Sequence, residues 1–251
     1  MATVTRAPFR GLVAFSLTEL RVQLHESTSI VTSMIVQVVL LVFVAILARD
    51  LLPVALFGAI LFSMFALGQR VQNEAAFVRI DHKLNELYLA GPLAPEAYFF
   101  GMSLGVLGAY LAPIGILVLI TYAIAGISLT TAVVLLATAT GVWLFASSFG
   151  YFVSSLFRDM RTIWPYASIF YSMFGVLPPV FYPLGYWPAP LVPVALALPP
   201  SAAAALVQST IGWATLTPWE VAFAATALVL EGLGTFVFAI YWSRRTVRED
   251  A

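Results

Sequence analysis

One pentapeptide in this sequence has the spacing of a serine nucleophile. Gly101-Met102-Ser103-Leu104-Gly105 fits the G-x-S-x-G pattern, in which serine sits on a strand-to-helix turn near a histidine. Here the pattern lies inside a long apolar run of helical character, and the two histidines, His25 and His82, lie in polar segments elsewhere. Two glycines four residues apart also form a surface on which another helix can pack closely. We therefore predict a helix-packing face here and no catalytic residue in the chain.

Other kinds of reactive or ligand-binding site lack the residues they need. The chain has no cysteine, which excludes thiol catalysis, disulfides and iron–sulfur ligation. The two histidines are far apart in sequence and do not have metal-ligand spacing. Lys83 is the only lysine, so no G-x-x-x-x-G-K-[ST] loop can hold a nucleotide phosphate. We expect no metal, no cofactor bound by this chain and no nucleic-acid partner. If ATP energy is used, another chain must bind the nucleotide.

Glu231 is the one clear ionisable residue inside an apolar run, near the middle of the last one. A carboxylate at that depth in a membrane is costly, which makes Glu231 a functional candidate by default. One hypothesis is a contact with substrate or a proton along a pathway. The other is a protonated or hydrogen-bonded glutamate that joins its helix to a neighbour, through Gln37 of the first apolar run. The residues leave both hypotheses open.

Two charged segments interrupt the apolar runs. Residues 73–96 hold six of the 24 acidic and basic residues, and their inner part, 84–89, predicts a short helix ended by Gly91-Pro92. A short helix held at a membrane surface between two spans is either a docking element for a partner or a connector. The second segment, Arg158-Asp159-Met160-Arg161, is either a topology signal or a second contact for that partner.

The composition predicts the fold class of the chain in which these segments lie. Hydrophobic residues make up 61% of the 251 residues and charged residues only 10%, which is typical of an all-α polytopic membrane protein with a single transmembrane domain. Six apolar runs predict transmembrane helices, at residues 28–48, 53–71, 97–125, 129–156, 163–177 and 218–242. Pro113 lies inside the third run and predicts a kink there.

An amphipathic helix is expected before the first span, over residues 8–26. Apolar residues recur there at helical spacing, namely Val13, Leu17, Leu20 and Leu24. Charged residues occupy the rest of the helical wheel, namely Arg10, Glu19, Arg21 and Glu26. Such a helix lies along the inner leaflet, or it is a solvated helix that only caps the first span.

Between the fifth and sixth spans the pattern changes. Residues 178–200 contain eight of the 15 prolines, a density at which no single spanning helix survives. The remaining helical pieces, 190–198 and 200–211, are too short to cross a bilayer. We therefore predict a re-entrant or surface-lying helical hairpin over residues 178–212.

Charge predicts the orientation. With both termini on one side, 11 of the 12 basic residues fall on that side, and Arg49 alone falls on the other. This bias predicts that the termini and both charged segments are cytoplasmic and that the hairpin is external.

Three segments resemble the membrane subunit of ABC-2 type exporters. Glu86-Leu87-Tyr88-Leu89-Ala90-Gly91-Pro92-Leu93 is similar to the coupling segment that follows the second span in that family. The stretch from Phe157-Arg158-Asp159 to Pro183 is similar to its charged loop, fifth span and external exit. The stretch from Pro199-Pro200-Ser201 to Gln208 is similar to its helical return after the fifth span. The usual Asn-Pro before this return is Leu198-Pro199 here, which weakens a glycan-export assignment.

The resemblance implies a multi-pass permease subunit in the cell membrane of a prokaryote. Its partners are a cytoplasmic ABC ATPase that binds ATP and Mg, a second copy of itself or a homologous permease, and membrane lipids. The residues that would contact the ATPase are Leu84, Glu86, Leu87, Tyr88, Leu89, Gly91, Pro92, Arg158, Asp159 and Arg161. The candidate substrate pathway comprises Phe65, Tyr171, Met173, Phe174 and Glu231. The expected substrate is lipophilic, drug-like or lipid-linked, and the direction is export.

Independently of the resemblance, the residues favour an externally powered permease. Secondary transporters usually have intramembrane ionisable sites and internal repeats, whereas this sequence has one such residue and no evident repeat. Two other functions remain open. One is an ion- or proton-coupled secondary transporter that uses Glu231, and the other is a non-transporting scaffold subunit of a membrane complex.

Overall fold

The computed structural model describes residues 8–25, 27–81 and 93–249, and within these ranges every regular element is helical. The predicted all-α class is confirmed at this level. The helices are α1 (Pro8–His25), α2 (Ser27–Leu47), η1 (Arg49–Leu51), α3 (Leu52–Ile80), α5 (Pro95–Ala125), α6 (Leu129–Ser154), α7 (Met160–Val176), η2 (Leu184–Tyr186), η3 (Ala189–Leu191), α8 (Val192–Ala197), α9 (Pro199–Thr210) and α10 (Pro218–Glu249).

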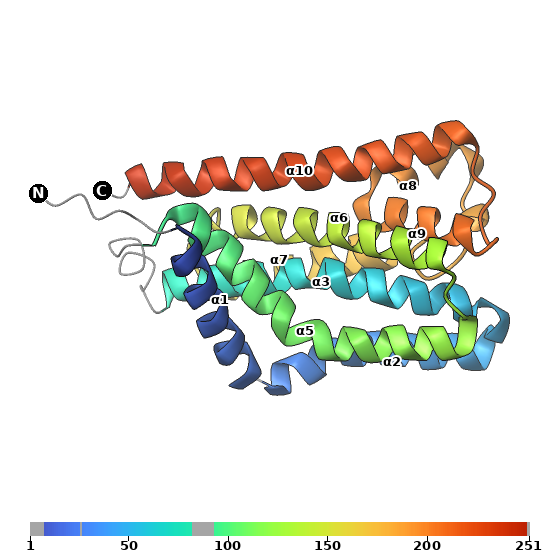
Figure 1. Cartoon of the computed structure of the whole chain (residues 1–251), viewed down its shortest axis with the longest axis horizontal. Coiled ribbons are helices and arrows are strands. Elements are labelled where there is room, and N and C mark those ends of the chain that lie inside the picture. The colour runs from blue at the N-terminus through green and yellow to red at the C-terminus, as the bar shows by residue number, and fades with distance from the viewer. Residues whose placement is uncertain (1–7, 26, 82–92, 250–251) are drawn as a thin grey trace, which may run out of the picture.

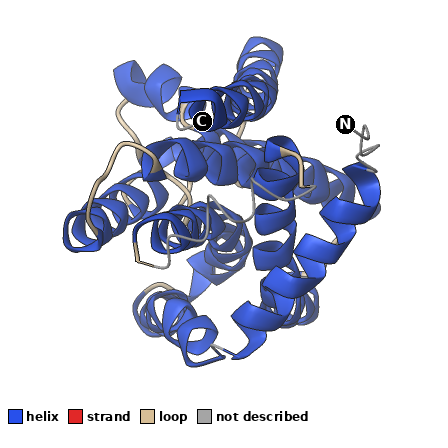
Figure 2. Ribbon diagram, turned by 90° about the vertical axis from the view of Figure 1, so that its left-hand side faces the viewer, coloured by secondary structure: helices blue, strands red, loops and turns tan. Residues whose placement is uncertain are grey.

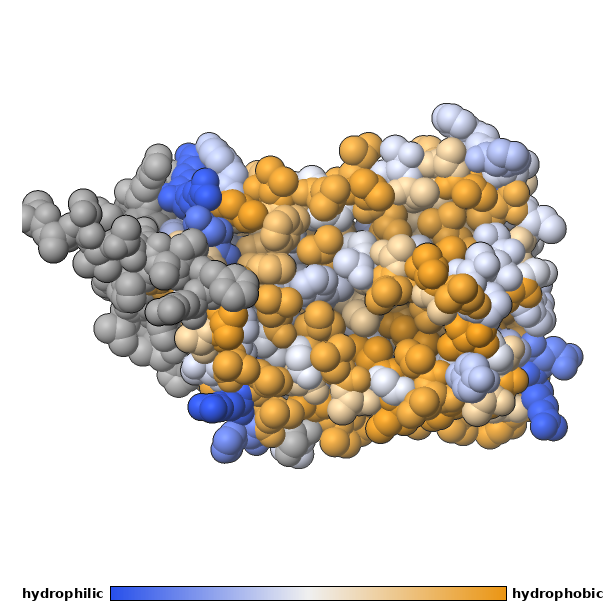
Figure 3. All heavy atoms as spheres, viewed as in Figure 1, coloured by the Kyte–Doolittle hydropathy of each residue, from blue (hydrophilic) through white to orange (hydrophobic). Residues whose placement is uncertain are grey.

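The long helices run side by side along the long axis of the molecule, with both termini at one end (Figure 1). Viewed towards that end, they form a bundle (Figure 2). A broad apolar band covers the middle of the surface, and hydrophilic residues gather at the two ends (Figure 3). Five helical segments are long and apolar enough to cross a membrane, namely Ile30–Leu47, Arg49–Ile80, Pro95–Ala125, Leu129–Ser154 and Pro218–Arg245. The architecture is therefore compatible with a membrane protein.

The fifth predicted span, 163–177, corresponds to the shorter helix α7. It begins earlier than predicted, at Met160, and contains 17 residues, which is about 26 Å of helix against a bilayer core of about 30 Å. It therefore does not belong to the five long segments. Helices α8 and α9 meet at 109°, and this bent pair would make a sixth crossing if it formed one broken span.

Local sequence signals explain where several helices begin. Pro53, Pro95 and Pro218 stand in the first turns of α3, α5 and α10, where a missing N–H costs nothing. Ser128 caps α6 by accepting a hydrogen bond from the N–H of Thr131 at 3.1 Å. Proline also acts inside a helix: α5 changes direction partway along its length (Figure 1), and Pro113 lies in its interior, where the missing N–H removes a backbone hydrogen bond.

Helix α3 is the centre of the bundle and packs against α2, α5, α6, α7 and α9. It is longer than the predicted span 53–71, because it continues to Ile80. Its last turns stay helical because Ala75, Ala76 and Val78 are buried and extend the packed face. Residues 73–80, which the sequence assigned to a segment between spans, are therefore part of α3.

Helix α1 packs against the two glycines of the G-x-S-x-G pattern. A Cβ atom at Gly101 would lie 2.8 Å from Phe15, and one at Gly105 would lie 2.5 Å from the Cβ of Glu19. Ser103 is buried inside α5. The predicted helix-packing face is confirmed, since only glycine lets the two helices approach this closely.

The buried face of α1 differs from the apolar stripe that the sequence suggested. Val13, Leu17 and Leu24 are exposed, whereas Glu19 is only 5% exposed and Gln23 only 3%. The Gln23 amide donates hydrogen bonds of 3.0 Å to carboxylate oxygens of Glu19 and Glu74. These bonds satisfy polar groups that burial would otherwise penalise, so the polar side of the helix can face α3 and α5.

Candidate functional site

The end of the bundle that carries the termini brings together four segments that lie far apart in sequence. These are the last turns of α3 and α10, the first turn of α5 and the loop between α6 and α7 (Figure 1). Seven of the residues predicted to contact an ATPase belong to residues 82–92 and lie outside the described residues, namely Leu84, Glu86, Leu87, Tyr88, Leu89, Gly91 and Pro92. Helix α3 ends at Ile80 and α5 begins at Pro95, and both of these helix ends lie at this end of the bundle (Figure 1).

Arg79 joins the end of α3 to the loop after α6. Its Nη2 donates hydrogen bonds of 2.6 Å to the backbone carbonyl oxygens of Ser154 and Phe157. The last carbonyls of a helix lack intrahelical partners, and a cation at that end also interacts favourably with the helix dipole. These hydrogen bonds hold the C-terminal end of α3, which precedes residues 82–92, against the loop that precedes Arg158.

Asp159 fixes the start of α7 within the second charged segment. Its Oδ1 accepts a hydrogen bond from the Thr162 N–H at 2.8 Å, and both carboxylate oxygens accept from the Thr162 hydroxyl. These hydrogen bonds from Thr162 hold the pKa of the Asp159 carboxyl below its usual range. Arg158 and Arg161 are exposed beside it. The loop therefore presents two guanidinium groups around an anchored carboxylate.

Two further contacts hold the end of α10 in place. Arg244 forms an exposed ion pair with Glu96 in the first turn of α5, with Nη2 3.0 Å from Oε1. The indole N–H of Trp242 donates to the hydroxyl of Ser155 at 2.9 Å, next to the end of α6. All four segments at this end are thus cross-linked by polar side chains.

The predicted pathway residues occupy different environments. Phe65 and Tyr171 are fully buried in the core with ring centroids 4.9 Å apart, and the Tyr171 hydroxyl donates to the carbonyl of Ala146. Phe174 is partly buried, and its ring contacts the ring of Phe170 at a tilt, with centroids 4.7 Å apart. Met173 is 52% exposed on the outer face of α7. Within this chain, the structure places Phe65 and Tyr171 in packing, and Met173 alone points to the outside.

Glu231 and Gln37 do not pair. Glu231 lies on α10, which packs on α6, α5 and α9. Its buried Oε2 has no hydrogen-bond partner among the described residues, and the same holds for Oε1 of Gln37 on α2. The two helices lie on opposite sides of the bundle in Figure 1. The suggested link through Gln37 is therefore wrong, because α6 and α3 lie between helices α10 and α2 in Figure 1.

Arg79 is the residue of this site that sequence reasoning missed. It counted only as one of 11 basic residues on the cytoplasmic side, since nothing in the sequence says which carbonyls it reaches. The signal was its position after a buried helical stretch, where a long cationic side chain can extend to a neighbouring helix end.

Among residues 8–25, 27–81 and 93–249, no group of three His, Asp or Glu side chains is placed to hold a metal ion. What the described part of the terminal end offers instead is a polar surface with the exposed cations Arg158, Arg161 and Arg244. Comparison of the sequence with protein-family models and with curated proteins gave no match.

Proposed function

We propose that this chain is the permease subunit of an ATP-driven exporter of the ABC-2 type. It would move a lipophilic, drug-like or lipid-linked substrate out across the cell membrane of a prokaryote. The subunit would pair with a second copy or a homologous permease, and a separate cytoplasmic ATPase would bind ATP and Mg. The resemblance of residues 86–93 and 157–183 to that family is one support.

The observation that carries the proposal is the pair of hydrogen bonds made by Arg79. They tie the helix that leads into residues 82–92 to the loop that holds Arg158, Asp159 and Arg161. A partner that binds both stretches would therefore move the ends of α3, α6 and α7 together. Because α3 is the central helix of the bundle, such a movement would reach the whole membrane domain.

In this proposal six helices cross the membrane, namely α2, α3, α5, α6, α7 and α10, and both termini are cytoplasmic. Eleven of the 12 basic residues then lie on the cytoplasmic side. Helix α1 lies along the inner leaflet, where its exposed apolar residues Val13, Leu17 and Leu24 meet lipid. The α8–α9 pair is a re-entrant hairpin on the external side.

The pathway would form where two permease subunits meet. Met173 belongs to an exposed apolar face of α7 that also includes Tyr166, Ile169 and Leu177. Phe174 lies partly buried beside this face. Phe65 and Tyr171 would support it from within the core.

The test is co-purification. The full chain, extracted from its host membrane in a mild detergent, is expected to bring with it a soluble ATPase that contains a P-loop. The double variant Glu86→Arg with Leu87→Asp should lose that ATPase, because it reverses one charge and places another in the predicted docking helix. Asp50→Arg, a charge reversal at the opposite end of the bundle, is the matched control and should retain it.

Absence of any ATPase from the intact chain would refute the proposal. Retention of the ATPase by the double variant would show instead that the docking surface lies elsewhere.

A second function is favoured by one observation, the half-buried Glu231 whose Oε2 lacks a hydrogen-bond partner in the described part of the chain. In an ion- or proton-coupled transporter this carboxyl would carry the coupling ion. Transport by that mechanism would collapse with the ion gradient, would persist without an ATPase and would be abolished in Glu231→Gln. In the ATP-driven mechanism, dissipating the gradient leaves transport intact.

A further inference from the structure

Helices α3 and α7 place four polar or aromatic side chains side by side on the surface of the bundle. The Gln69 amide donates a hydrogen bond of 3.1 Å to the Ser168 hydroxyl, and this contact is exposed. Asn73 follows Gln69 by one turn on the same side of α3, and Trp164 precedes Ser168 by one turn on the same side of α7. We call these four residues the α3–α7 polar face.

The two helices run in opposite directions, which sets Asn73 beside Trp164. Helix α3 ends, and α7 begins, at the end of the bundle that carries the termini, where Arg79 of α3 bonds to the carbonyl of Phe157. One turn from the Gln69–Ser168 contact towards that end therefore leads to Asn73 on α3 and to Trp164 on α7. Trp164 is 57% exposed and Asn73 is partly exposed.

The amides of this face retain hydrogen-bonding capacity. The bond to Ser168 uses one of the two amide N–H groups of Gln69. The Oδ1 atom of Asn73 is buried and has no hydrogen-bond partner within the described residues. Acyl chains cannot satisfy such groups, and a polar group held in an apolar environment without a partner is destabilising. A ligand that supplies hydroxyl groups would satisfy them.

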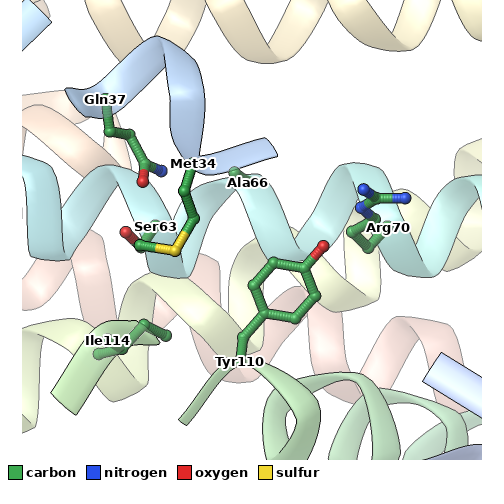
Figure 4. A pocket seen from close by; sticks show the side chains of 7 residues that line it. All are labelled: Met34, Gln37, Ser63, Ala66, Arg70, Tyr110 and Ile114. Atoms are coloured by element: carbon green, nitrogen blue, oxygen red, sulfur yellow. The ribbon is translucent and has the colours of Figure 1, made fainter. Parts of the chain in front are cut away.

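The charged residues next to this face on α3 are directed elsewhere. Arg70 lies 6.0 Å from the centroid of the Tyr110 ring, in the pocket between α2, α3 and α5 (Figure 4). Glu74 accepts a hydrogen bond of 3.0 Å from the Gln23 amide of α1. The side of α3 that faces α7 therefore presents two neutral carboxamides, each of which can both donate and accept.

The position along α3 indicates the depth of the face in a bilayer. Helix α3 begins at Leu52, directly after the charged residues Arg49 and Asp50. From Leu52 it rises about 26 Å to Gln69 and about 32 Å to Asn73, against a bilayer core of about 30 Å. The face thus lies at the boundary between acyl chains and headgroups, in the leaflet nearer the termini. Tryptophan is enriched at this boundary, which suits Trp164.

We infer that the α3–α7 polar face binds the uncharged sugar headgroup of a glycolipid in that leaflet. Sugar hydroxyls donate to and accept from the amides of Gln69 and Asn73, and the apolar C–H side of the sugar ring lies against the indole of Trp164. A phosphate group suits the face less well, because Arg161 stands about 10 Å beyond Ser168 along α7. The inference does not depend on the proposed export function.

The experiment measures the affinity of the full chain for three lipids in phosphatidylcholine nanodiscs by native mass spectrometry. They are monoglucosyl diacylglycerol, its permethylated form, which keeps the ring but has no O–H group, and phosphatidylglycerol. The intact chain should prefer the free glucosyl lipid over the permethylated form roughly tenfold, the effect of one hydrogen bond. It should bind phosphatidylglycerol more weakly than the free glucosyl lipid.

Two variants separate the roles of the amide and the indole. Gln69→Leu should abolish the preference for free hydroxyls, and the fold should tolerate it because the side chain makes an exposed contact. Trp164→Ala should weaken both glucosyl lipids alike and keep the preference. Thr140→Val is the matched control, since it removes an exposed hydroxyl that bonds only to the Leu136 carbonyl of its own helix, and it should change neither affinity.

Three results would overturn the inference. The first is equal affinity of the intact chain for the free and permethylated lipids. The second is a preference that survives Gln69→Leu, which would place the headgroup away from this face. The third is tighter binding of phosphatidylglycerol than of the glucosyl lipid, which would show that the cations near the termini select the headgroup.

Discussion

The two ends of the bundle are fastened by different chemistry. At the end that carries the termini, charged side chains cross between helices. Arg79 donates to the carbonyls of Ser154 and Phe157, and Arg244 pairs with Glu96. These groups are exposed or partly buried, so water and salt can compete with them.

At the opposite end, neutral groups make the links, and these groups are buried or partly buried. The Gln208 side chain accepts from the Leu184 N–H at 3.0 Å and donates to the carbonyls of Pro179 and Tyr182. Trp187 donates to the Tyr182 hydroxyl. Neutral groups can be buried fully without the desolvation penalty that a charge incurs. The comparison indicates a rigid end formed around Gln208 and an adjustable end formed around Arg79.

The largest loss of folding stability is expected from Gln208→Leu at the rigid end. The variant leaves the Leu184 N–H and two carbonyls buried without partners, and at about 1–3 kcal/mol each the loss of stability should exceed about 3 kcal/mol. Denaturation in detergent measures it. Ser209→Ala is the control, because that hydroxyl only donates to the carbonyl of Leu206 in its own helix. A similar loss of stability in both variants would mean that Gln208 does not hold residues 179–184 in place.

At the adjustable end, Arg79→Met should cost about 2 kcal/mol, since it removes two charge-assisted hydrogen bonds while keeping an apolar stem. Arg161→Met serves as control, because the side chain of Arg161 is exposed and its loss should change stability little. If both variants melted alike, Arg79 would not be what joins α3 to the loop after α6. Arg79→Lys should recover only part of the loss, since lysine lacks the planar fork.

Much of this architecture is predictable because proline and apolar runs act locally. The starts of α3, α5 and α10 follow from prolines in their first turns. The glycine pair at Gly101 and Gly105 indicates a packing face without revealing which helix it receives.

The long-range links could not be predicted in the same way. Glu19 looks like a surface charge on the helical wheel, yet it is buried and accepts a hydrogen bond from the amide of Gln23. The same amide also donates to Glu74 of α3. Gln208 stands in an alanine-rich run, where a buried amide role has no local signature. Periodicity in the sequence shows which face of a helix carries the apolar residues. Which neighbouring helix covers that face depends on the packing of the whole bundle.

A smaller effect on stability is expected when the pH is lowered, through Asp159 at the adjustable end. Hydrogen bonds from Thr162 lower the pKa of Asp159 below its ordinary 3.8, so ionised Asp159 stabilises the folded state above that pH and loses this contribution as pH falls below it. Asp159→Asn keeps an acceptor for the cap without a charge. The melting temperatures of the two proteins should differ near pH 7 and converge below pH 3.8. A constant difference would show that Asp159 acts only as an uncharged cap.

The smallest effect should come from the ion pair between Arg244 and Glu96. Both side chains are exposed, so salt screens their attraction, and holding two long side chains in one geometry costs entropy. In a double-mutant cycle with Arg244→Gln and Glu96→Gln, the coupling should be weak at low salt and absent at 1 M salt. The same salt change should leave the contribution of Gln208 unaltered, because its partners are neutral and buried. A coupling that persisted in high salt would make the end that carries the termini as rigid as the other, and the contrast between them would fail.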